Sequence, residues 1–436
     1  MKTKPMLGRF SLYGFLKNQQ YYDPFLILAF RQMGLSFFMI GILVAFREVI
    51  ANLMEIPSGA VADLFGRRKA MILSFVCYII SFMVFGVTGV AATNGTIPPA
   101  AILPLLFGAM GFFAVGNAFR TGTHKAMIFT WLRVEGREDE RTKVYGYTRS
   151  WSKLGSALSA ILAAVFVFAT SNYVYIFFFS IIPYVLGIVN FMGYPREVDG
   201  NIKKATSGKE VMLHLKKTLA VSVKQASLRR LVCESMGFEG FFKAAKDYLQ
   251  PILKAAAIPL TGALLLSDRL SEHQQVALLV GPVYFALYLL SALASRKAYV
   301  LVDKHGSEDH TARFLWLISL LILTALVPAL YYCWFTVIIL GFIALYVMQN
   351  LWRPVLISRF DTHSDEDMGA TILSIESQAK SVATMIIAPG MGYVVDLMQT
   401  RMIGCLPFWP AAIFGAAVAL AFFVTARTPT RSHTRG

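Results

Sequence analysis

Apolar blocks long enough to cross a bilayer recur from one end of the chain to the other, with short polar segments between them. The hydrocarbon core of a bilayer is ~30 Å thick, and about 20 helical residues span it. The composition agrees: 56% of the residues are hydrophobic and 15% are charged, whereas soluble chains carry about 25% charged residues. This pattern excludes a soluble enzyme, a disordered chain and a coiled coil, and predicts an all-α membrane protein.

The blocks divide into twelve predicted transmembrane helices. Their ranges are 11–30, 37–61, 70–90, 100–128, 144–169, 174–194, 231–253, 276–295, 314–331, 334–353, 369–395 and 405–426. The start of this series has a second interpretation, because residues 25–46 could form one span with Arg31 inside it. A break at residues 31–36 instead leaves two spans of adequate length and places Lys17 and Asp23 within the membrane.

Basic residues are distributed unequally over the connecting segments. With twelve spans assigned, one side holds 27 Lys and Arg residues and the other holds 4. Because positively charged loops stay in the cytoplasm, we expect both termini to be cytoplasmic and the protein to lie in the cytoplasmic (inner) membrane. This topology accounts for the net charge of +16, so we expect the lipid bilayer and a small-molecule substrate as partners, and no nucleic acid.

A single long polar segment, residues 195–230, follows the sixth span and carries nine Lys and Arg residues. It predicts an N-terminal six-helix bundle at 1–194, a cytoplasmic basic linker at 195–230 and a C-terminal six-helix bundle at 231–436. A solvated loop that enforces topology explains the basic linker more simply than a docking site for a partner or for anionic lipid.

The two halves carry a faint internal repeat. Residues 19–26 of the first span align with residues 246–253 of the seventh, and the aligned positions share a tyrosine, a proline and a leucine. Internal repeats of this kind are typical of secondary transporters.

A glycine-rich basic motif, Gly59-Ala-Val-Ala-Asp63-Leu-Phe-Gly66-Arg67-Arg68-Lys69, stands between the second and third spans. It resembles the signature cytoplasmic loop of the major facilitator superfamily, and the preceding Glu55-Ile-Pro-Ser-Gly59 is similar to a subgroup of that family. The resemblance implies two pseudo-symmetric six-helix bundles and a gate that contains Gly59, Asp63, Gly66, Arg67 and Arg68. We expect Asp63 to pair with Arg67; the alternative is a basic turn that only fixes topology.

Ionisable side chains at membrane depth are costly, so they are expected to line a cavity or to pair. The predicted hairpin of spans one and two sets Asp23 level with Arg47 and Lys17 level with Glu55. This predicts two ion pairs, with Glu48 and Asn52 as alternate partners. These pairs either lock the two helices together or take part in handling the substrate or protons.

The seventh span contains Glu239, Lys243 and Asp247 at i,i+4 spacing, which places them on one stripe of a helix. The family resemblance implies that the first and seventh helices line the central cavity, so this stripe is the best candidate for the transport path. If the span begins later, Glu239 becomes an ordinary interfacial charge.

Two further pairs of charged residues stand at i,i+4 spacing. Arg120 and His124 end the fourth span, where the resemblance implies proton coupling or binding of an acidic substrate group; the alternative is a basic helix end that meets lipid headgroups. Glu376 and Lys380 in the eleventh span could satisfy each other.

Ten cations and seven anions fall at predicted membrane depth. The surplus of positive charge favours an anionic or zwitterionic substrate, because a buried cation needs a partner. The residues predicted to line the path of substrate or protons are Lys17, Asp23, Arg47, Glu48, Glu55, Arg120, His124, Glu239, Lys243, Asp247 and Glu376.

Together these features predict a secondary active transporter of a small organic solute that works by alternating access and is coupled to protons. A multidrug/proton efflux transporter is the alternative, although the fifth span lacks the Gly-Pro-x-x-Gly-Gly run of many drug/proton antiporters. A non-transporting membrane sensor or binding protein is a second alternative.

Catalytic and cofactor-binding patterns are missing from the sequence. It contains neither a Gly-x-x-x-x-Gly-Lys-Ser/Thr nucleotide-binding loop nor a Gly-x-Ser-x-Gly nucleophile motif. The four cysteines, Cys77, Cys233, Cys333 and Cys405, are scattered singly, which gives little support to a metal site or a disulfide. We therefore expect no enzymatic activity, no cofactor and a monomeric protein.

Overall fold

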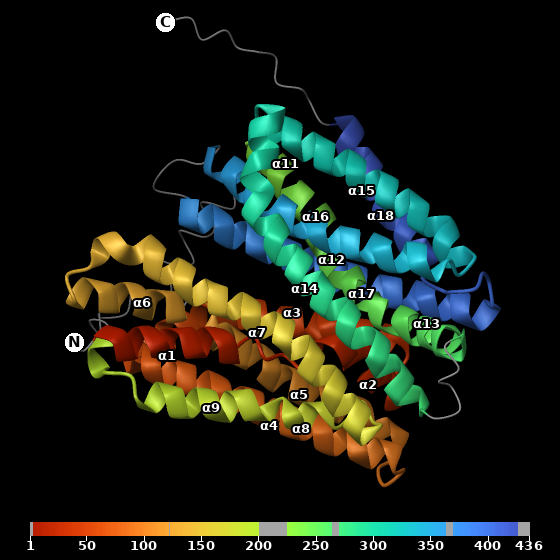
Figure 1. Cartoon of the computed structure of the whole chain (residues 1–436), viewed down its shortest axis with the longest axis horizontal. Coiled ribbons are helices and arrows are strands. Elements are labelled where there is room, and N and C mark those ends of the chain that lie inside the picture. The colour runs from red at the N-terminus through yellow and green to blue at the C-terminus, as the bar shows by residue number, and fades with distance from the viewer. Residues whose placement is uncertain (1–2, 122, 200–224, 264–269, 363–368, 426–436) are drawn as a thin grey trace, which may run out of the picture. The chain divides into compact units, whose positions relative to one another are not determined.

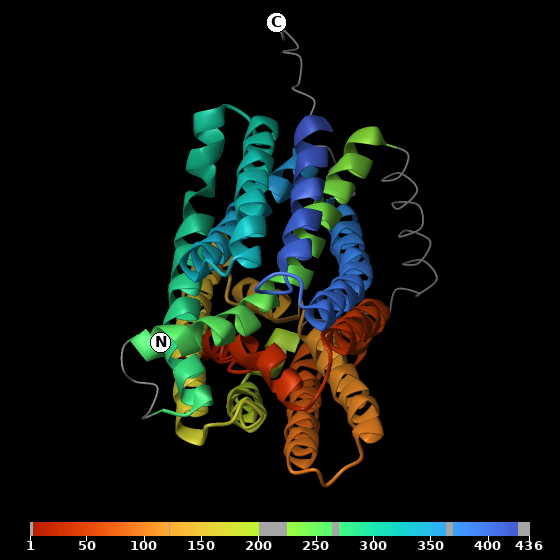
Figure 2. The same ribbon diagram turned by 90° about the vertical axis from the view of Figure 1, so that its right-hand side faces the viewer.

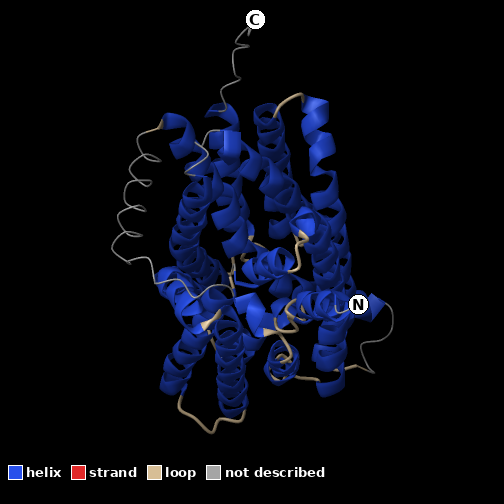
Figure 3. Cartoon of the chain, turned by 90° about the vertical axis from the view of Figure 1, so that its left-hand side faces the viewer, coloured by secondary structure: helices blue, strands red, loops and turns tan. Residues whose placement is uncertain are grey.

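The computed structural model describes residues 3–121, 123–199, 225–263, 270–362 and 369–425 (Figure 1). Within these residues the regular secondary structure is helical and contains no strand (Figure 3). The predicted all-α architecture is therefore confirmed for the described part of the chain.

All twelve predicted spans fall on helical segments of the described chain. Eight of these segments are long and apolar enough to cross a membrane: Phe37–Glu55, Arg67–Thr93, Pro99–Val134, Glu138–Thr170, Glu272–His305, Glu308–Tyr331, Phe335–Phe360 and Ser374–Arg401. Two shorter apolar helices, Ile176–Met192 and Trp409–Thr425, match the sixth and twelfth spans. The first and seventh spans also fold as helix, but with interruptions.

The chain forms two compact units, of which unit 1 comprises residues 1–210 and 253–289. Its elements are α1 (Thr3–Leu16), η1 (Asp23–Phe25), α2 (Leu26–Gln32), α3 (Phe37–Phe65), α4 (Arg67–Thr93), α5 (Pro99–Arg120), α6 (Thr123–Val134), η2 (Glu138–Glu140), α7 (Arg141–Thr170), α8 (Ile176–Phe179), α9 (Ile181–Met192) and η3 (Arg196–Asp199). Most of α13 (Leu249–Ala263) and the first half of α14 (Glu272–His305) also belong to it.

Helices α4 and α5 form an antiparallel hairpin in unit 1, visible as the orange pair in Figure 2. Serine hydroxyls fasten this hairpin, since Ser74 donates to the Gly116 carbonyl at 2.6 Å and Ser81 to the Ala109 carbonyl at 2.8 Å. Close approach of the two backbones needs a small residue, because a Cβ atom on Gly116 would lie 2.9 Å from the Ser74 carbonyl oxygen. The hairpin thereby sets the position of Arg120 at the end of α5.

Unit 2 comprises residues 211–252 and 290–436. Its elements are α11 (Ala226–Ser235), the π-helix η4 (Met236–Gly240), α12 (Phe241–Ala245), η5 (Lys246–Tyr248), the start of α13, the second half of α14, α15 (Glu308–Tyr331), α16 (Phe335–Thr362), α17 (Gly369–Arg401) and α18 (Trp409–Thr425). Helix α15 packs against both α16 and α18, and α17 packs against η4 and α12.

The compact units do not coincide with the sequence halves, because residues 253–289 pack with unit 1. The Gln274 side chain of this segment, for example, donates a hydrogen bond to the Phe168 carbonyl of α7 at 3.1 Å. The predicted division into bundles at 1–194 and 231–436 remains a prediction. Most of the predicted linker, residues 200–224, lies outside the described residues.

The first predicted span, residues 11–30, is a discontinuous helix rather than a single one. Helix α1 ends at Leu16, residues 17–22 form turns, and helical structure resumes at η1. The Gln19 amide donates to the Gly155 carbonyl of α7 at 3.0 Å, and the Asn18 amide donates to the Gly14 carbonyl at 2.8 Å. These bonds hold the turns in place of the helical hydrogen bonds that are lost there.

The seventh span is irregular at the place that the sequence repeat aligns with this break. Its helix passes from α11 through the π-helix η4 to α12, and then through the 3-10 turn η5 at residues 246–248. Interrupted helices and single π-helical turns recur at binding sites, because they free backbone groups and redirect side chains.

Cys333 and Cys405 form a disulfide with their Cα atoms 5.7 Å apart, so the expectation that disulfides have little support is wrong. The bond joins the loop between α15 and α16 to the loop between α17 and α18, and the Cys405 amide also donates to the Tyr331 carbonyl at 2.8 Å. Two single cysteines 72 residues apart have no local spacing that would reveal their pairing; only the return of the helices brings them together.

Candidate functional site

A cluster of tyrosines surrounds Arg120 in unit 1. Four tyrosine side chains interact with its guanidinium and are each at most 7% exposed: Tyr13 of α1, Tyr22 of the helix break, Tyr78 of α4 and Tyr184 of α9. The guanidinium carbon lies 5.7 Å from the centre of the Tyr78 ring, and one terminal nitrogen donates to the Asn117 side chain at 2.9 Å. We call Arg120 and these four residues the arginine–tyrosine cluster.

Arg120 has no acidic partner in the described part of the chain. Its Nε atom is buried and makes no hydrogen bond there. Its guanidinium contacts neutral groups, namely the Asn117 side chain and the Tyr78 ring, and tyrosine hydroxyls are neutral at ordinary pH. A guanidinium prefers the planar, bidentate match of a carboxylate or phosphate. The arginine–tyrosine cluster therefore offers the chemistry of an anion-binding site with aromatic walls.

Lys17 adds a second positive charge beside this cluster. It is the first residue of the helix break, its Nζ atom lies 5.9 Å from the centre of the Tyr13 ring, and it is repelled by Arg120 and Arg149. Within the described residues Lys17 forms no ion pair, and Glu55, its predicted partner, is exposed. The structure does not pair Lys17 with Glu55; Lys17 lies beyond the end of α1, where the regular helix on which the predicted hairpin register was based has stopped.

His124 lies beside the arginine–tyrosine cluster but on a different helix from Arg120. Helix α5 ends at Arg120 and α6 begins at Thr123, so the predicted i,i+4 relation is interrupted by the helix junction. The centres of the His124 and Tyr13 rings lie 3.9 Å apart with the ring planes tilted by 39°, and the His124 Nε2 atom lies 3.5 Å from the Tyr194 hydroxyl.

The partners of Asp23 and Arg47 differ in part from the expectation. Two nitrogens of Arg47 donate to one carboxylate oxygen of Glu48, at 3.0 and 3.1 Å. Glu48 is the predicted alternate partner, and it is the next residue along the chain. Asp23 accepts a hydrogen bond of 2.6 Å from the Tyr288 hydroxyl of α14. The direct pair between Asp23 and Arg47 remains a prediction.

A second group of charges lies in unit 2, and we call it the charge cluster of unit 2. It contains Ser235 of α11, Glu239 of η4, Gln349 and Arg353 of α16, and Glu376 and Lys380 of α17. One oxygen of Glu376 receives the Ser235 hydroxyl at 2.5 Å and an Arg353 nitrogen at 2.7 Å, with the Lys380 ammonium at 3.7 Å. The predicted contact between Glu376 and Lys380 is present, but Arg353 is the closer cation.

Glu239 lies in this cluster without an ion pair among the described residues. Its two oxygens are 3.4 and 3.5 Å from the Gln349 amide nitrogen, and the residue is 8% exposed. The π-helix and the 3-10 turn interrupt the regular stripe that the sequence predicted for Glu239, Lys243 and Asp247. Asp247 binds its neighbour Lys246 at 2.7 Å, and the predicted contact of Asp247 with Lys243 remains a prediction.

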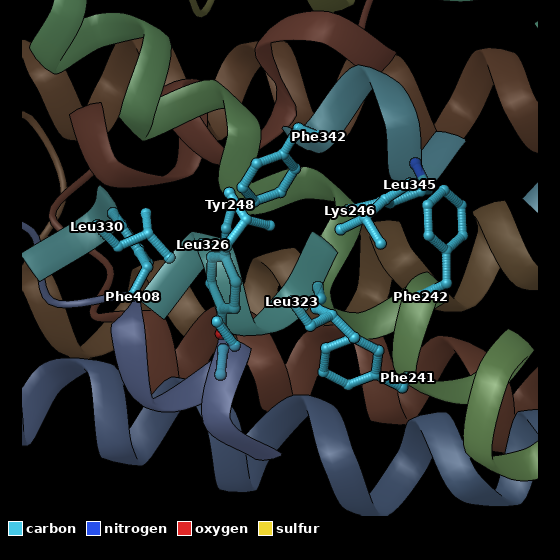
Figure 4. A pocket seen from close by; sticks show the side chains of 13 residues that line it. Phe241, Phe242, Lys246, Tyr248, Leu323, Leu326, Leu330, Phe342, Leu345 and Phe408 are labelled. Carbon is cyan, nitrogen blue, oxygen red and sulfur yellow. The ribbon is translucent and has the colours of Figure 1, made fainter. Parts of the chain in front are cut away.

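Lys246 borders a pocket with apolar walls in unit 2 (Figure 4). Phe241 and Phe242 of α12, Tyr248 and the leucines of α15 line it, with Phe408 at the other side. The cavity between these side chains has a volume of about 30 Å³.

The basic motif between the second and third spans is anchored within unit 1. The Arg67 guanidinium donates to the Thr130 hydroxyl of α6 at 2.7 Å, and the Arg68 guanidinium donates to the Tyr194 carbonyl at 3.1 Å. The side chain of Asp63 lies outside the described residues, so its predicted pairing with Arg67 remains a prediction. Gly59 is exposed, with open space where a Cβ atom would stand.

Asp199, which the sequence did not single out, caps the helix that follows this motif. Its carboxylate accepts the backbone amide of Arg68 at the start of α4, at 2.7 Å. Gly66 allows this approach with a φ of 94°, and a Cβ atom there would lie 3.1 Å from the Asp199 carboxyl carbon. The motif and Asp199 are far apart in sequence, so no local pattern linked them.

A buried ionic network in unit 2 was likewise missed. Glu234 binds Arg359 at 2.6 Å and Arg230 at 2.8 Å, and Arg359 also binds Asp309 at 2.7 Å. The network ties α11, α15 and α16 together. The main partner of Glu234, Arg359, is 125 residues away along the chain, so no local spacing revealed it.

The comparisons with known proteins agree with this architecture. The model of the Major Facilitator Superfamily matches residues 11–370, whereas no curated protein sequence matches the chain. A crystal structure of the nucleoside transporter NupG has a TM-score of 0.71 at 11% identity, covering 97% of this chain and 99% of that one. A D-xylose-proton symporter has a TM-score of 0.70 at 15% identity, covering 98% of both chains.

A bacterial homologue of the iron transporter ferroportin, in its inward-facing state, has a TM-score of 0.70 at 11% identity and covers 97% of this chain and 100% of that one. At these identities the solved structures show the fold, while the family model covers more than half of the sequence. The chain is a multi-pass membrane transporter rather than an enzyme, and it belongs to the Major Facilitator Superfamily.

Proposed function

We propose that this protein is a secondary active transporter that moves a small anionic or zwitterionic organic solute across the cytoplasmic membrane by alternating access, coupled to protons. The observation that carries the substrate class is Arg120, a guanidinium surrounded by buried tyrosines and without an acidic partner among the described residues. A solute with a carboxylate or phosphate supplies the missing counter-ion.

The tyrosine rings favour a solute with an apolar or planar body. Buried Tyr13, Tyr22, Tyr78 and Tyr184 present ring faces for stacking and hydroxyls for hydrogen bonds. Lys17 adds positive charge next to them. Sites of this kind, with apolar walls and a few placed polar groups, suit drug-sized and metabolite-sized ligands.

The fold neighbours do not narrow the substrate further. Their titles name a nucleoside transporter, a xylose–proton symporter and an iron transporter homologue, so one scaffold serves solutes of different charge. The substrate class proposed here rests on the side chains of unit 1 alone.

The proposed orientation has both termini in the cytoplasm. The distribution of basic residues supports it. The disulfide between Cys333 and Cys405 supports it independently, because the predicted topology puts both loops on the non-cytoplasmic side, where oxidising conditions preserve disulfides. In this orientation the Gly59–Arg68 segment lies on the cytoplasmic side, where we propose that Asp63, Gly66, Arg67 and Arg68 form part of the gate.

A thermal-unfolding screen of the purified protein in detergent tests the substrate class. Acidic, zwitterionic and cationic metabolites and drugs are compared. A ligand present at about 100 times its dissociation constant adds about 2.7 kcal/mol to the free energy of unfolding. We expect acidic or zwitterionic compounds to raise the melting temperature, and the best of them to be taken up by vesicles that contain the protein.

Three arginine variants make the test specific. Arg120→Gln should abolish the stabilisation by acidic compounds, and Arg120→Lys should retain part of it, because lysine keeps the charge but loses the bidentate geometry. Arg137→Gln is the matched control. Arg137 is not part of the arginine–tyrosine cluster, and it already has an acidic partner, Glu140, at 2.7 Å. Stabilisation by lipophilic cations alone would refute the anion site and favour multidrug efflux.

A further inference from the structure

Buried glutamates in the described part of the chain fall into two kinds. Four glutamates are at most 8% exposed. Three of them bind an arginine at 2.6 to 3.0 Å, namely Glu48 with Arg47, Glu234 with Arg359 and Glu376 with Arg353. Glu239 is the exception, because its nearest polar partner is the neutral amide of Gln349 at 3.4 Å.

The charged groups around Glu239 come from each element packed against it. Helix α16 contributes Arg353, and α17 contributes Glu376 and Lys380. The adjoining segments of Glu239's own span contribute Lys243 from α12 and Glu234 from α11, and Glu234 is paired with arginines of its own. The sequence of α18 contains no charged residue. Arg353 and Lys380 attract Glu239 electrostatically and Glu376 repels it, but the nearest cations are engaged by Glu376.

Burial makes an ionised carboxylate without a cation costly, whereas a protonated carboxyl group is neutral and can donate a hydrogen bond. The two amide contacts of Gln349, at 3.4 and 3.5 Å, are too long to offset much of that cost. Glu239 is therefore the buried glutamate of the described chain that gains most from taking up a proton. It also lies on the π-helix η4, a helix irregularity that is frequent at functional sites.

We propose that Glu239 is a proton-binding site, and that its protonation state decides which carboxylate binds Arg353. With a proton on Glu239, Arg353 binds Glu376, as in the structure described here. When Glu239 releases the proton to water, two carboxylates compete for one guanidinium, and Arg353 moves toward Glu239.

The competition has a structural consequence for α16 and α17. Glu376 keeps the Ser235 hydroxyl and Lys380 when Arg353 leaves, so both carboxylates stay partnered after the exchange. One oxygen of Glu376 is buried without a hydrogen bond among the described residues, and Lys380 on the same helix can approach it. The exchange thus gives two discrete arrangements of neighbouring helices, which is the kind of bistable element that a switch requires.

The proton site can be tested on the protein alone, without a known solute. The purified wild-type protein in lipid is titrated from about pH 5 to about pH 8, a range that covers carboxyl groups displaced upward by burial. Infrared difference spectra record the absorption of protonated carboxyl groups. We expect one buried carboxyl band that disappears as the pH rises, and we expect Glu239→Gln to lack it.

Glu234→Gln is the matched control, because Glu234 is at least as buried but is paired with Arg359 and takes no part in the exchange; it should keep the titrating band. Glu239→Asp provides a second variant in case the amide variant folds poorly, and it should keep a titrating carboxyl with a changed frequency. A band that persists unchanged in folded Glu239→Gln protein would overturn the proposal.

The role of this site in coupling rests on the proposed transport function, and a separate experiment addresses it. The probe is the acidic compound that stabilises the protein most in the thermal screen. In vesicles, Glu239→Gln should still exchange this compound across the membrane, but an imposed acid gradient should no longer accelerate its uptake. If the wild-type protein takes up none of the compound, the result counts against the proposed transport function. If uptake by Glu239→Gln protein still responds to the acid gradient, the coupling role of Glu239 is refuted.

Discussion

Replacing Gly155 by alanine should separate α1 from α7 at the helix break. A Cβ atom on Gly155 would lie 2.6 Å from the carbonyl oxygen of Phe15 and 3.2 Å from its Cα atom. Both are backbone atoms, so no side-chain rotation can relieve the overlap. The Gly155 carbonyl also accepts the Gln19 amide at 3.0 Å, and that bond holds the turns between α1 and η1.

The size of the effect follows from three opposing contributions. Overpacking a methyl group against a fixed neighbour costs about 1–3 kcal/mol. Alanine gains about 1 kcal/mol over glycine within a helix, and weakening the Gln19 hydrogen bond costs about 1 kcal/mol. We therefore expect Gly155→Ala to lower the free energy of unfolding by about 1–3 kcal/mol.

Gly146 provides the matched control on the same helix. A Cβ atom there would meet nothing within 4 Å, so Gly146→Ala should leave the stability unchanged or raise it by up to about 1 kcal/mol. The assay is thermal unfolding of both variants and the wild type in the same detergent. Gly155→Ala protein as stable as Gly146→Ala protein would show that the close approach of α1 and α7 is not a constraint.

Three further substitutions test the contacts that the sequence did not reveal. Replacing Cys333 and Cys405 by serine opens a loop of 72 residues and should cost about 4 kcal/mol in the chain-entropy limit, seen as a lower melting temperature that reductant no longer changes. Arg359→Gln leaves Glu234 with a single, more exposed arginine and should cost about 3–5 kcal/mol; if adding Glu234→Gln restores nothing, the buried charge is not the cause. Asp199→Asn weakens the cap of α4 and should cost about 0.5–1 kcal/mol at low salt, with less effect at high salt.

The membrane-spanning segments could be predicted from the sequence because bilayer thickness imposes a length and an apolar composition on each of them. Hydropathy averages over a whole span, however, and cannot register that six residues inside it leave the helix. The segment from Lys17 to Tyr22 is polar, and it was counted with the first span because a hairpin needs two helices of adequate length. The Gln19 side chain of this segment donates to the Gly155 carbonyl of α7. The polar run was visible in the sequence, but the contact with α7 that accommodates it appears only when the helices are packed.

The candidate site shows the same limit. Predicting that Arg120 and Glu239 lie at membrane depth needs only their position in an apolar block, but whether each one is partnered depends on other helices. Glu376, for example, pairs with Lys380 one helical turn away at 3.7 Å, but its closer partner is Arg353 on α16 at 2.7 Å. Spacing along one helix identifies pairs that could form, and packing decides which of them do.

Arg120 and Arg353 end the fourth and tenth predicted spans, and their different surroundings lead to a last prediction. Arg353 is neutralised by Glu376, whereas Arg120 lies among neutral tyrosines. In our proposals a monoanionic solute adds one negative charge at Arg120, and a proton adds one positive charge at Glu239. Moving charge across the membrane potential costs about 2.3 kcal/mol per charge per 100 mV. Because the loaded protein then carries the same net charge as the empty one, uptake of a monoanion with one proton should not respond to the membrane potential. An imposed potassium diffusion potential in vesicles measures this directly, and a several-fold change in the initial rate at constant pH gradient would mean that the proton and solute charges do not cancel.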